Sequence, residues 1–201
     1  MGGVEALRDL LGALPIDFPL PLLIVHHMSA DSGSNLARML DAHCKIRVKE
    51  ADEEEAITPG IAYLAPPNYH MLVERDGTLA LSVDMPVNFA RPSVDVLFES
   101  AAYAFGPALI GVILTGAGSD GAKGLKLIKD RGGLAIVQDP ADAEADSMPR
   151  SALAAVEVDH VLPLQEICGL LCSLAAQGPG KAEKTRSNGD DRNRKDPDPA
   201  G

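Results

Sequence analysis

Short, wholly apolar runs alternate with amphipathic segments along most of the chain. The runs are rich in Leu, Ile and Val and predict buried strands at 22–25, 61–64, 109–114, 134–137 and 160–162. The segments between them repeat apolar residues at helical spacing and predict helices at 4–14, 33–42, 93–105, 122–131 and 164–176. Strands that are apolar throughout and alternate with helices are typical of a parallel sheet covered on both faces. The pattern therefore predicts an α/β fold with a doubly wound, mainly parallel sheet.

One pair of strand-like runs interrupts this alternation. Residues 71–73 and 79–83 flank the sequence Arg75-Asp76-Gly77-Thr78. An Asp-Gly pair between two such runs is typical of a β-hairpin, because tight hairpin turns need residues that tolerate positive φ. We therefore expect an antiparallel hairpin beside the parallel sheet.

The apolar pattern ends near Gly178. Residues 179–201 contain no Val, Ile, Leu, Met, Phe, Tyr or Cys, and they carry six basic and five acidic residues. A segment with nothing to bury cannot offset the entropy lost on ordering. The sequence therefore predicts one folded domain over 1–178 and a disordered tail over 179–201.

Composition narrows the class of protein. The 201 residues include 18 Lys and Arg against 29 Asp and Glu, a formal net charge of −11. Because a phosphate backbone binds mainly to Lys and Arg, this balance argues against a nucleic-acid partner. No apolar run approaches the ~18 residues that span a membrane, and the first residues lack the basic region of a signal peptide. We expect a cytoplasmic protein without membrane insertion.

The cysteines and histidines do not form a metal-binding pattern. Three cysteines are too few for a disulfide framework and suit a reducing compartment. Cys168 and Cys172 lie four apart in an apolar helical segment, where packing explains them better than a metal does. His26 and His27 are adjacent after a strand, so their side chains point to opposite faces. The other histidines are expected at surface or packing positions: His43, His70 and His160. No metal site is predicted.

The strand at 109–114 runs into a Gly-rich turn that opens a helix. Gly116, Gly118 and Gly121 form a G-x-G-x-x-G pattern, and Asp139 follows the next strand about 20 residues later, as in the dinucleotide-binding fingerprint. Asp120, however, places a carboxylate in the loop that would hold a pyrophosphate, and like charges repel. Dinucleotide binding therefore stays open as an alternative.

The same turn nearly matches a nucleophile elbow. Residues 117–121 read G-x-S-x-G with Ala in place of the first glycine, which makes Ser119 a candidate nucleophile. His27 follows the strand 22–25, and the carboxyl ends of parallel strands share one edge of the sheet. We therefore expect His27 and Asp120 to converge there, as half of an acyl-transfer site.

Several sequence blocks, in this order, resemble the catalytic domain of chemotaxis protein-glutamate methylesterases of the CheB type. The blocks are GGVEAL (2–7), LLIVHHM (22–28), TPGIAYLAP (58–66), RPSVDVLF (91–98), ILTGAGSDGA (113–122) and SMPR (147–150). The resemblance runs from Gly2 to about Ala176. It implies a doubly wound α/β fold and the hydrolysis of glutamyl methyl esters on methyl-accepting receptors, with glutamine deamidation in some members and no cofactor.

The resemblance also assigns residues. His27 matches the family's catalytic histidine, the general base, and Asp120 matches the acid that orients the imidazole. Ser119 is then a neighbour of the triad. Met28 and Arg91 lie in blocks that line the site in the family and are candidate substrate contacts. Ala117 stands where many members have Met beside the oxyanion hole.

The family's nucleophile has no counterpart in the 201 residues. Its turn reads Gly-x-Ser-x-Gly-Gly, and Gly2-Gly3 match the last two glycines, so the serine falls immediately before Met1 and the first strand precedes it. The resemblance therefore predicts a catalytic domain lacking its first strand, either because translation is taken to start at an internal Met or because the protein is a catalytically inactive receptor- or partner-binding module. The 201-residue chain is therefore expected to have little or no esterase activity.

Overall fold

A computed structural model describes residues 2–27 and 35–177. The helices are α1 (Gly2–Ala13), α2 (Leu36–Asp41), α3 (Val94–Phe105), α4 (Ala122–Asp130), α5 (Ser147–Ala155) and α6 (Leu164–Gln177), with a 3₁₀ turn at Gly106–Ala108. The strands are β1 (Leu22–Ile24), β2 (Arg47–Glu50), β3 (Ile61–Leu64), β4 (His70–Val73), β5 (Leu79–Ser82), β6 (Ile110–Ile113), β7 (Leu134–Gln138) and β8 (His160–Leu162). The predicted tail at 179–201 lies outside the described residues.

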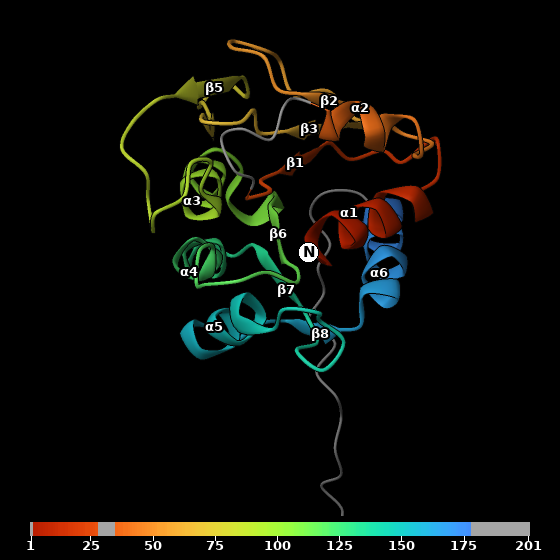
Figure 1. Cartoon of the computed structure of the whole chain (residues 1–201), viewed down its shortest axis with the longest axis vertical. Coiled ribbons are helices and arrows are strands. Elements are labelled where there is room, and N and C mark those ends of the chain that lie inside the picture. The colour runs from red at the N-terminus through yellow and green to blue at the C-terminus, as the bar shows by residue number, and fades with distance from the viewer. Residues whose placement is uncertain (1, 28–34, 178–201) are drawn as a thin grey trace, which may run out of the picture.

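The parallel strands form two three-stranded sheets. One has the order β1-β3-β2 and the other β6-β7-β8, with every neighbouring pair parallel. In Figure 1 the strands succeed one another as β2, β3, β1, β6, β7 and β8, but within the described residues no strand pairing joins β1 to β6. The predicted α/β class is confirmed, and the sheet has an interruption between β1 and β6.

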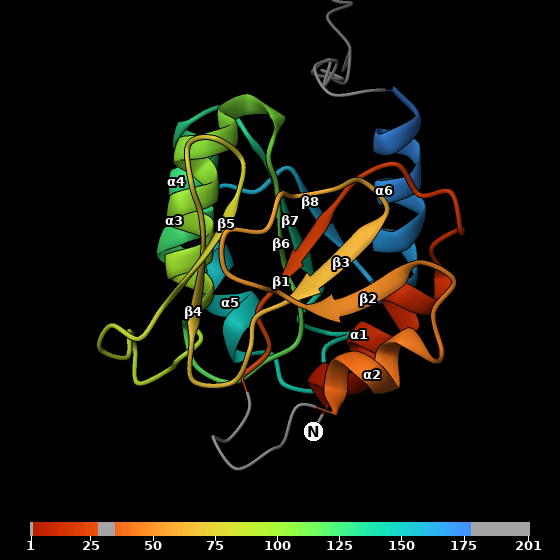
Figure 2. The same ribbon diagram turned by 90° about the horizontal axis from the view of Figure 1, so that it is seen from above.

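Helices cover both faces of the strands, as Figures 1 and 2 show. Alternate residues of one strand point to opposite faces, so Ile136 packs with α1 and α6 whereas Ala135 and Val137 pack with α4 and α5. The same alternation divides β6: Val112 packs on the side of α1 and α6, and Ile113 packs on the side of α4 and α5. Wholly apolar strands arise because both faces are buried.

The predicted hairpin is present. β4 and β5 pair antiparallel, with His70 opposite Ser82 and Val73 opposite Leu79, and β4 packs against α3. Its turn contains Gly77 at φ +85°, where a residue with a Cβ would be strained. The segment after β5 leads to α3 and, as shown below, to the functional site.

None of the described helices is both long and apolar enough to cross a membrane.

Candidate active site

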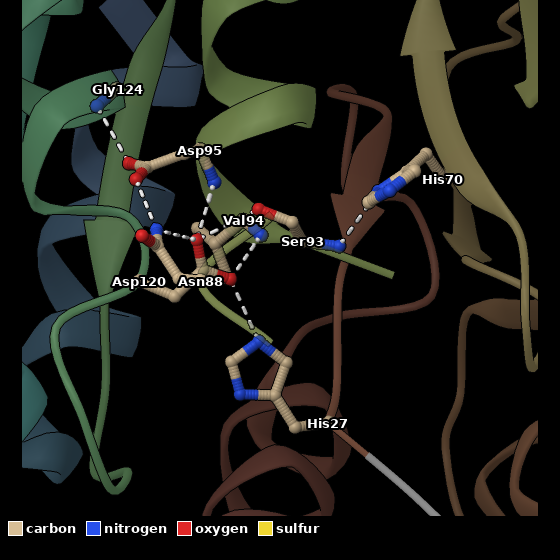
Figure 3. A network of polar contacts seen from close by, with 8 residues as sticks. All are labelled: His27, His70, Asn88, Ser93, Val94, Asp95, Asp120 and Gly124. Carbon is tan, nitrogen blue, oxygen red and sulfur yellow. Dashed lines mark hydrogen bonds and ion pairs between the residues drawn. The ribbon is translucent and has the colours of Figure 1, made fainter. Parts of the chain in front are cut away.

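His27 and Asp120 meet at the carboxyl ends of β1 and β6. His27 lies three residues after β1, and Asp120 lies in the turn between β6 and α4. The His27 Nε2 atom is 2.8 Å from Asp120 Oδ2, and Figure 3 shows the imidazole directed at the carboxylate. The Asp120 side chain is only 4% exposed whereas that of His27 is 33% exposed. The acid is thus inside the protein and the histidine is accessible from solvent.

The N-terminus of α3 surrounds the Asp120 carboxylate with donors. Oδ2 accepts a hydrogen bond from the Val94 amide at 2.7 Å, in addition to His27. Oδ1 accepts hydrogen bonds from Ser93 Oγ at 2.8 Å and the Asp95 amide at 3.1 Å. Burial by itself raises the pKa of Asp120, but these hydrogen bonds outweigh it and lower the pKa to about 2. Asp120 is therefore ionised at neutral pH.

The ionised carboxylate determines which nitrogen of His27 carries the proton. A carboxylate only accepts hydrogen bonds, so neutral His27 must donate from Nε2 to Asp120. Its Nδ1 atom is then unprotonated and carries a lone pair. In Figure 3 this second ring nitrogen lies on the side of the ring away from Asp120. The pair thus presents an oriented base whose cationic form a buried carboxylate would stabilise.

The hydrogen bonds of Asp120 predict a pH-dependent stability. A carboxyl whose pKa falls from 3.8 to about 2 on folding adds roughly 2 kcal/mol to the free energy of unfolding. This contribution is complete above the unfolded pKa and is lost as the pH falls from about 4 through 2. Urea unfolding should therefore show a steeper loss of stability over this range in the wild type than in Asp120→Asn. The exposed-residue control Asp17→Asn should keep the wild-type slope; equal slopes for Asp120→Asn and wild type would contradict the prediction.

A cavity of about 640 Å³ opens beside the pair. The residues that line it come from the ends of β1, β3 and β6 and from the segment before α3: His27, Asn68, Pro86, Asn88, Phe89, Ala90, Arg91, Pro92, Ala117, Gly118, Ser119 and Asp120. An open cavity with polar groups at the carboxyl ends of parallel strands is where α/β proteins bind ligands.

The Gly-rich turn is occupied by contacts within the protein. The Gly118 amide donates to Ser147 Oγ at 3.0 Å, and the Gly124 amide in α4 donates to Asp95 Oδ1 at 2.8 Å. A pyrophosphate would need such amides free, and it would also face the ionised Asp120. These two amides are therefore not free to bind a pyrophosphate, and they give no support to the dinucleotide alternative.

Ser119 lines the same cavity and is exposed. The hydrogen bond of His27 goes to Asp120, and the described hydrogen bonds include none between His27 and Ser119. The geometry thus favours Ser119 as a wall residue of the cavity over Ser119 as nucleophile.

Of the two candidate substrate contacts, Arg91 is among the described residues. Met28 lies outside the described residues. Arg91 lines the cavity, but its Nη1 atom donates to the Val83 and Asp84 carbonyl oxygens at 2.7 and 3.0 Å, while Nε is buried and has no hydrogen-bond partner among the described residues. Arg91 therefore holds the segment before α3 in place, and its contact with substrate stays a prediction.

The remaining histidines occupy different environments. His43 is exposed and contacts the Met39 carbonyl, and His160 lies in β8. Burial and the neighbouring His27 lower the pKa of His26.

Among the described residues no group of three or more His, Cys, Asp or Glu could hold a metal ion.

Sequence reasoning missed a polar network behind Asp120. His70 is buried in β4; its Nδ1 accepts from the Ser93 amide at 3.2 Å and its Nε2 lies 3.3 Å from the Met85 carbonyl oxygen. Asn88 Nδ2 contacts Asp95 Oδ2 at 2.9 Å and Asp120 Oδ1 at 3.4 Å (Figure 3). The only sequence signal was the RPSVDVLF block, which contains Ser93 and Asp95 but gives no indication that their partners lie elsewhere.

Comparisons with known proteins agree with one another. The profile of the CheB methylesterase family matches residues 1–171. A provisionally named protein-glutamate methylesterase/protein-glutamine glutaminase of Leptospira interrogans is 52% identical over 173 residues, covering 86% of this chain and 90% of that protein. Protein-glutamate methylesterase/protein-glutamine glutaminase 2 of Cupriavidus pinatubonensis is 46% identical over 169 residues, covering 83% of this chain and 47% of that longer protein.

A solved structure extends the agreement to the fold. The crystal structure of the Thermotoga maritima CheB methylesterase catalytic domain superposes with a TM-score of 0.82 at 35% sequence identity, covering 86% of this chain and 93% of that one. With a family profile over most of its length, relatives near 50% identity and the same fold, this chain belongs to the CheB methylesterase family.

Proposed function

We propose that the protein is a protein-glutamate methylesterase of a chemotaxis or chemosensory pathway. It hydrolyses glutamyl methyl esters on methyl-accepting receptors and releases methanol. The observation that carries this proposal is the 2.8 Å contact between His27 Nε2 and the buried Asp120 carboxylate, at the edge of an open cavity. The names of the relatives support the same activity and add glutamine deamidation, which would use the same residues.

In the proposed mechanism a serine hydroxyl attacks the ester carbonyl carbon. His27 Nδ1 takes the hydroxyl proton, and Asp120 stabilises the imidazolium that results. The imidazolium then protonates the departing methoxide, which leaves as methanol. Water, deprotonated by the same nitrogen, hydrolyses the acyl-enzyme and restores the serine. We assign the Ala117 backbone amide, on the wall of the cavity, as a donor to the oxyanion.

The serine is proposed to lie immediately before Met1, at the end of a strand that fills the interruption between β1 and β6. All three residues of β1 are apolar and partly exposed, and so are Ile110 and Val112 of β6. Unpaired apolar strand edges of this kind are a liability that proteins normally cover. A strand between them would hydrogen-bond with both and join the two sheets into one.

The start of α1 supports this placement. A Cβ added at Gly3 would lie 2.9 Å from His26 Nε2 and 4.0 Å from the Thr115 carbonyl oxygen, and one added at Gly2 would collide with the Glu144 side chain. The first turn of α1 therefore lies between the residues that follow β1 and β6. This position of Gly2 and Gly3 supports a nucleophile that reaches the edge of the sheet where His27 and Asp120 meet.

The test is methanol release from a methylated receptor. We expect the protein translated with the codons that precede Met1 to release methanol and to react with a serine-directed fluorophosphonate, and the 201-residue chain to do neither at a comparable rate. Ser119→Ala in the longer protein is the matched control and should keep its activity. If neither form released methanol but both bound the receptor, the protein would be a binding module; if Ser119→Ala abolished activity of the 201-residue chain, Ser119 would be the nucleophile.

A further inference from the structure

Residues 83–91, which make up most of the segment between β5 and α3, form one rim of the cavity, and we call them the arm. Its large apolar side chains are exposed at alternating positions: Val83, Met85, Val87 and Phe89. Phe89 is completely exposed and Met85 is 83% exposed. Isolated exposed apolar residues are common, but a cluster beside a functional cavity indicates a surface that contacts another molecule.

A tight turn at the tip of the arm holds Phe89 in an unusual conformation. The Val87 amide donates to the Ala90 carbonyl at 3.1 Å, and the Ala90 amide donates to the Val87 carbonyl at 2.9 Å. The two residues between them, Asn88 and Phe89, have φ of 51° and 63°. Asn tolerates this left-handed region, whereas a bulky residue such as Phe is a genuine outlier there. Because its ring is fully exposed, burial of the ring in the described protein does not offset this strain.

The arm is attached to the proposed catalytic Asp120 and to β4, and a hydrogen bond between its two ends closes it. Asn88, the residue before Phe89, contacts the Asp120 carboxylate through its Nδ2 atom. His70 Nε2 lies 3.3 Å from the Met85 carbonyl, and Arg91 Nη1 donates to the Val83 carbonyl at 2.7 Å. Phe89 therefore keeps a defined position relative to His27, and both side chains line the same cavity. Backbone strain that is maintained at such a place points to a role in function.

We propose that Phe89 determines substrate specificity by contacting an apolar side chain of the substrate protein about one helical turn from the glutamyl ester. The inference rests on the proposed methylesterase function, because it takes the molecule in the cavity to be a helical protein segment that carries the ester. Residues four apart lie on the same face of a helix. An apolar neighbour at that spacing would cover the Phe89 ring while the ester reaches His27.

Two synthetic helical peptides test this with the 201-residue chain itself. Each has a central γ-methyl glutamate; one has Leu four residues before and after it, and the other has Ser at both positions. Binding is followed by the NMR signals of the His27 ring. We expect the wild type to bind the Leu peptide about tenfold more tightly than the Ser peptide, and Phe89→Gly to reduce this ratio to near one.

Further variants separate the role of the ring from effects on folding. Gly and Asn both tolerate the positive φ, so Phe89→Gly and Phe89→Asn should remain folded and lose the preference alike. Phe89→Tyr keeps an aromatic ring and should retain it. Ile16→Ser removes an apolar side chain that is 76% exposed and is not among the cavity residues, and it should leave the ratio unchanged.

The outcomes distinguish this inference from the proposed function. A wild type without preference for the Leu peptide, or a Phe89→Gly variant with an unchanged ratio, would overturn the role of Phe89 while the His27 signals still respond to the esters. If neither ester peptide moved the His27 signals of the wild type, the proposed function itself would be contradicted, and the specificity role with it.

Discussion

Asp120→Asn is expected to lower kcat/KM for methyl ester hydrolysis about 10⁴-fold in the form of the protein that carries the serine. Both carboxylate oxygens accept hydrogen bonds, Oδ2 from His27 and the Val94 amide, and Oδ1 from Ser93 Oγ and the Asp95 amide. The side-chain amide of Asn accepts hydrogen bonds only through its oxygen. If the NH₂ group takes the place of Oδ2, this NH₂ faces the Val94 N–H and forces His27 into the other tautomer.

The tautomer is what makes the expected loss large. With an amide NH₂ opposite it, Nε2 becomes the acceptor and Nδ1 carries the proton, so Nδ1 cannot take a proton from the serine. The imidazolium also loses the negative charge that stabilises it. His27→Gln removes the base altogether and should reduce activity at least as much.

The measurement is initial-rate kinetics of methanol release on a methylated receptor fragment. Ser93→Ala is a milder change, because it removes one hydrogen-bond donor to Asp120 and keeps the negative charge. We expect it to lower kcat/KM by about tenfold or less. Asp17→Asn alters an exposed carboxylate that is not among the cavity residues and serves as the control. Activity of Asp120→Asn within tenfold of the wild type would rule out the orienting role assigned to Asp120.

The second large effect concerns stability and compares two glycines of the same turn. Gly121 and Gly118 have nearly equal φ, 92° and 93°. A Cβ at Gly121 would lie 2.6 Å from Ile113 Cδ1 and 2.7 Å from Val94 Cγ1, whereas a Cβ at Gly118 would meet nothing within 4 Å. Gly118→Ala should therefore lower the free energy of unfolding by about 1 kcal/mol, from backbone strain alone. Gly121→Ala should lower it by about 3 kcal/mol, since the new methyl group also collides with buried side chains.

Urea unfolding of the 201-residue chain measures this difference without any assay of activity. Because Gly121 lies between Asp120 and the first residue of α4, the collision with Val94 should also displace the α3 N-terminus that donates to the Asp120 carboxylate. The Gly118 variant has the same backbone strain and is the matched control. Equal destabilisation by the two substitutions would show that the close contacts of Gly121 are absent in solution.

Hydrophobic patterning predicted most of the sheet but missed two elements. β2 (Arg47–Glu50) lies at the edge of its sheet, and three of its four residues are charged, so no wholly apolar run marks it. α5 (Ser147–Ala155) is short and contains Pro149 in its first turn. Pro is compatible with that position, but it obscured the helical spacing of the apolar residues. Both misses are elements in which only one side is packed against the core.

The site was predicted in part, for a physical reason. His27 and Asp120 could be placed together because each follows a strand of a parallel sheet, and the carboxyl ends of such strands lie at one edge. Asn88 and His70 could not, because a loop and an antiparallel hairpin bring them to α3, and no periodicity describes how such a segment folds back. Their contacts with Asp95, Ser93 and the arm appear only in the folded chain.

The sequence by itself determined the fold class, the family resemblance and the two residues at the strand ends, since these depend on local spacing and on the order of elements. Only the tertiary structure decided the ionised state of Asp120, the His27 tautomer and the attachment of the arm. The hydrogen bonds of Asp120 come from groups 25 or more residues away in the chain, such as the Ser93 hydroxyl, and the contact that attaches the arm to Asp120 spans 32 residues. Hydrogen bonds of this kind are set by distances between atoms, and such distances exist only once helices and sheets have packed.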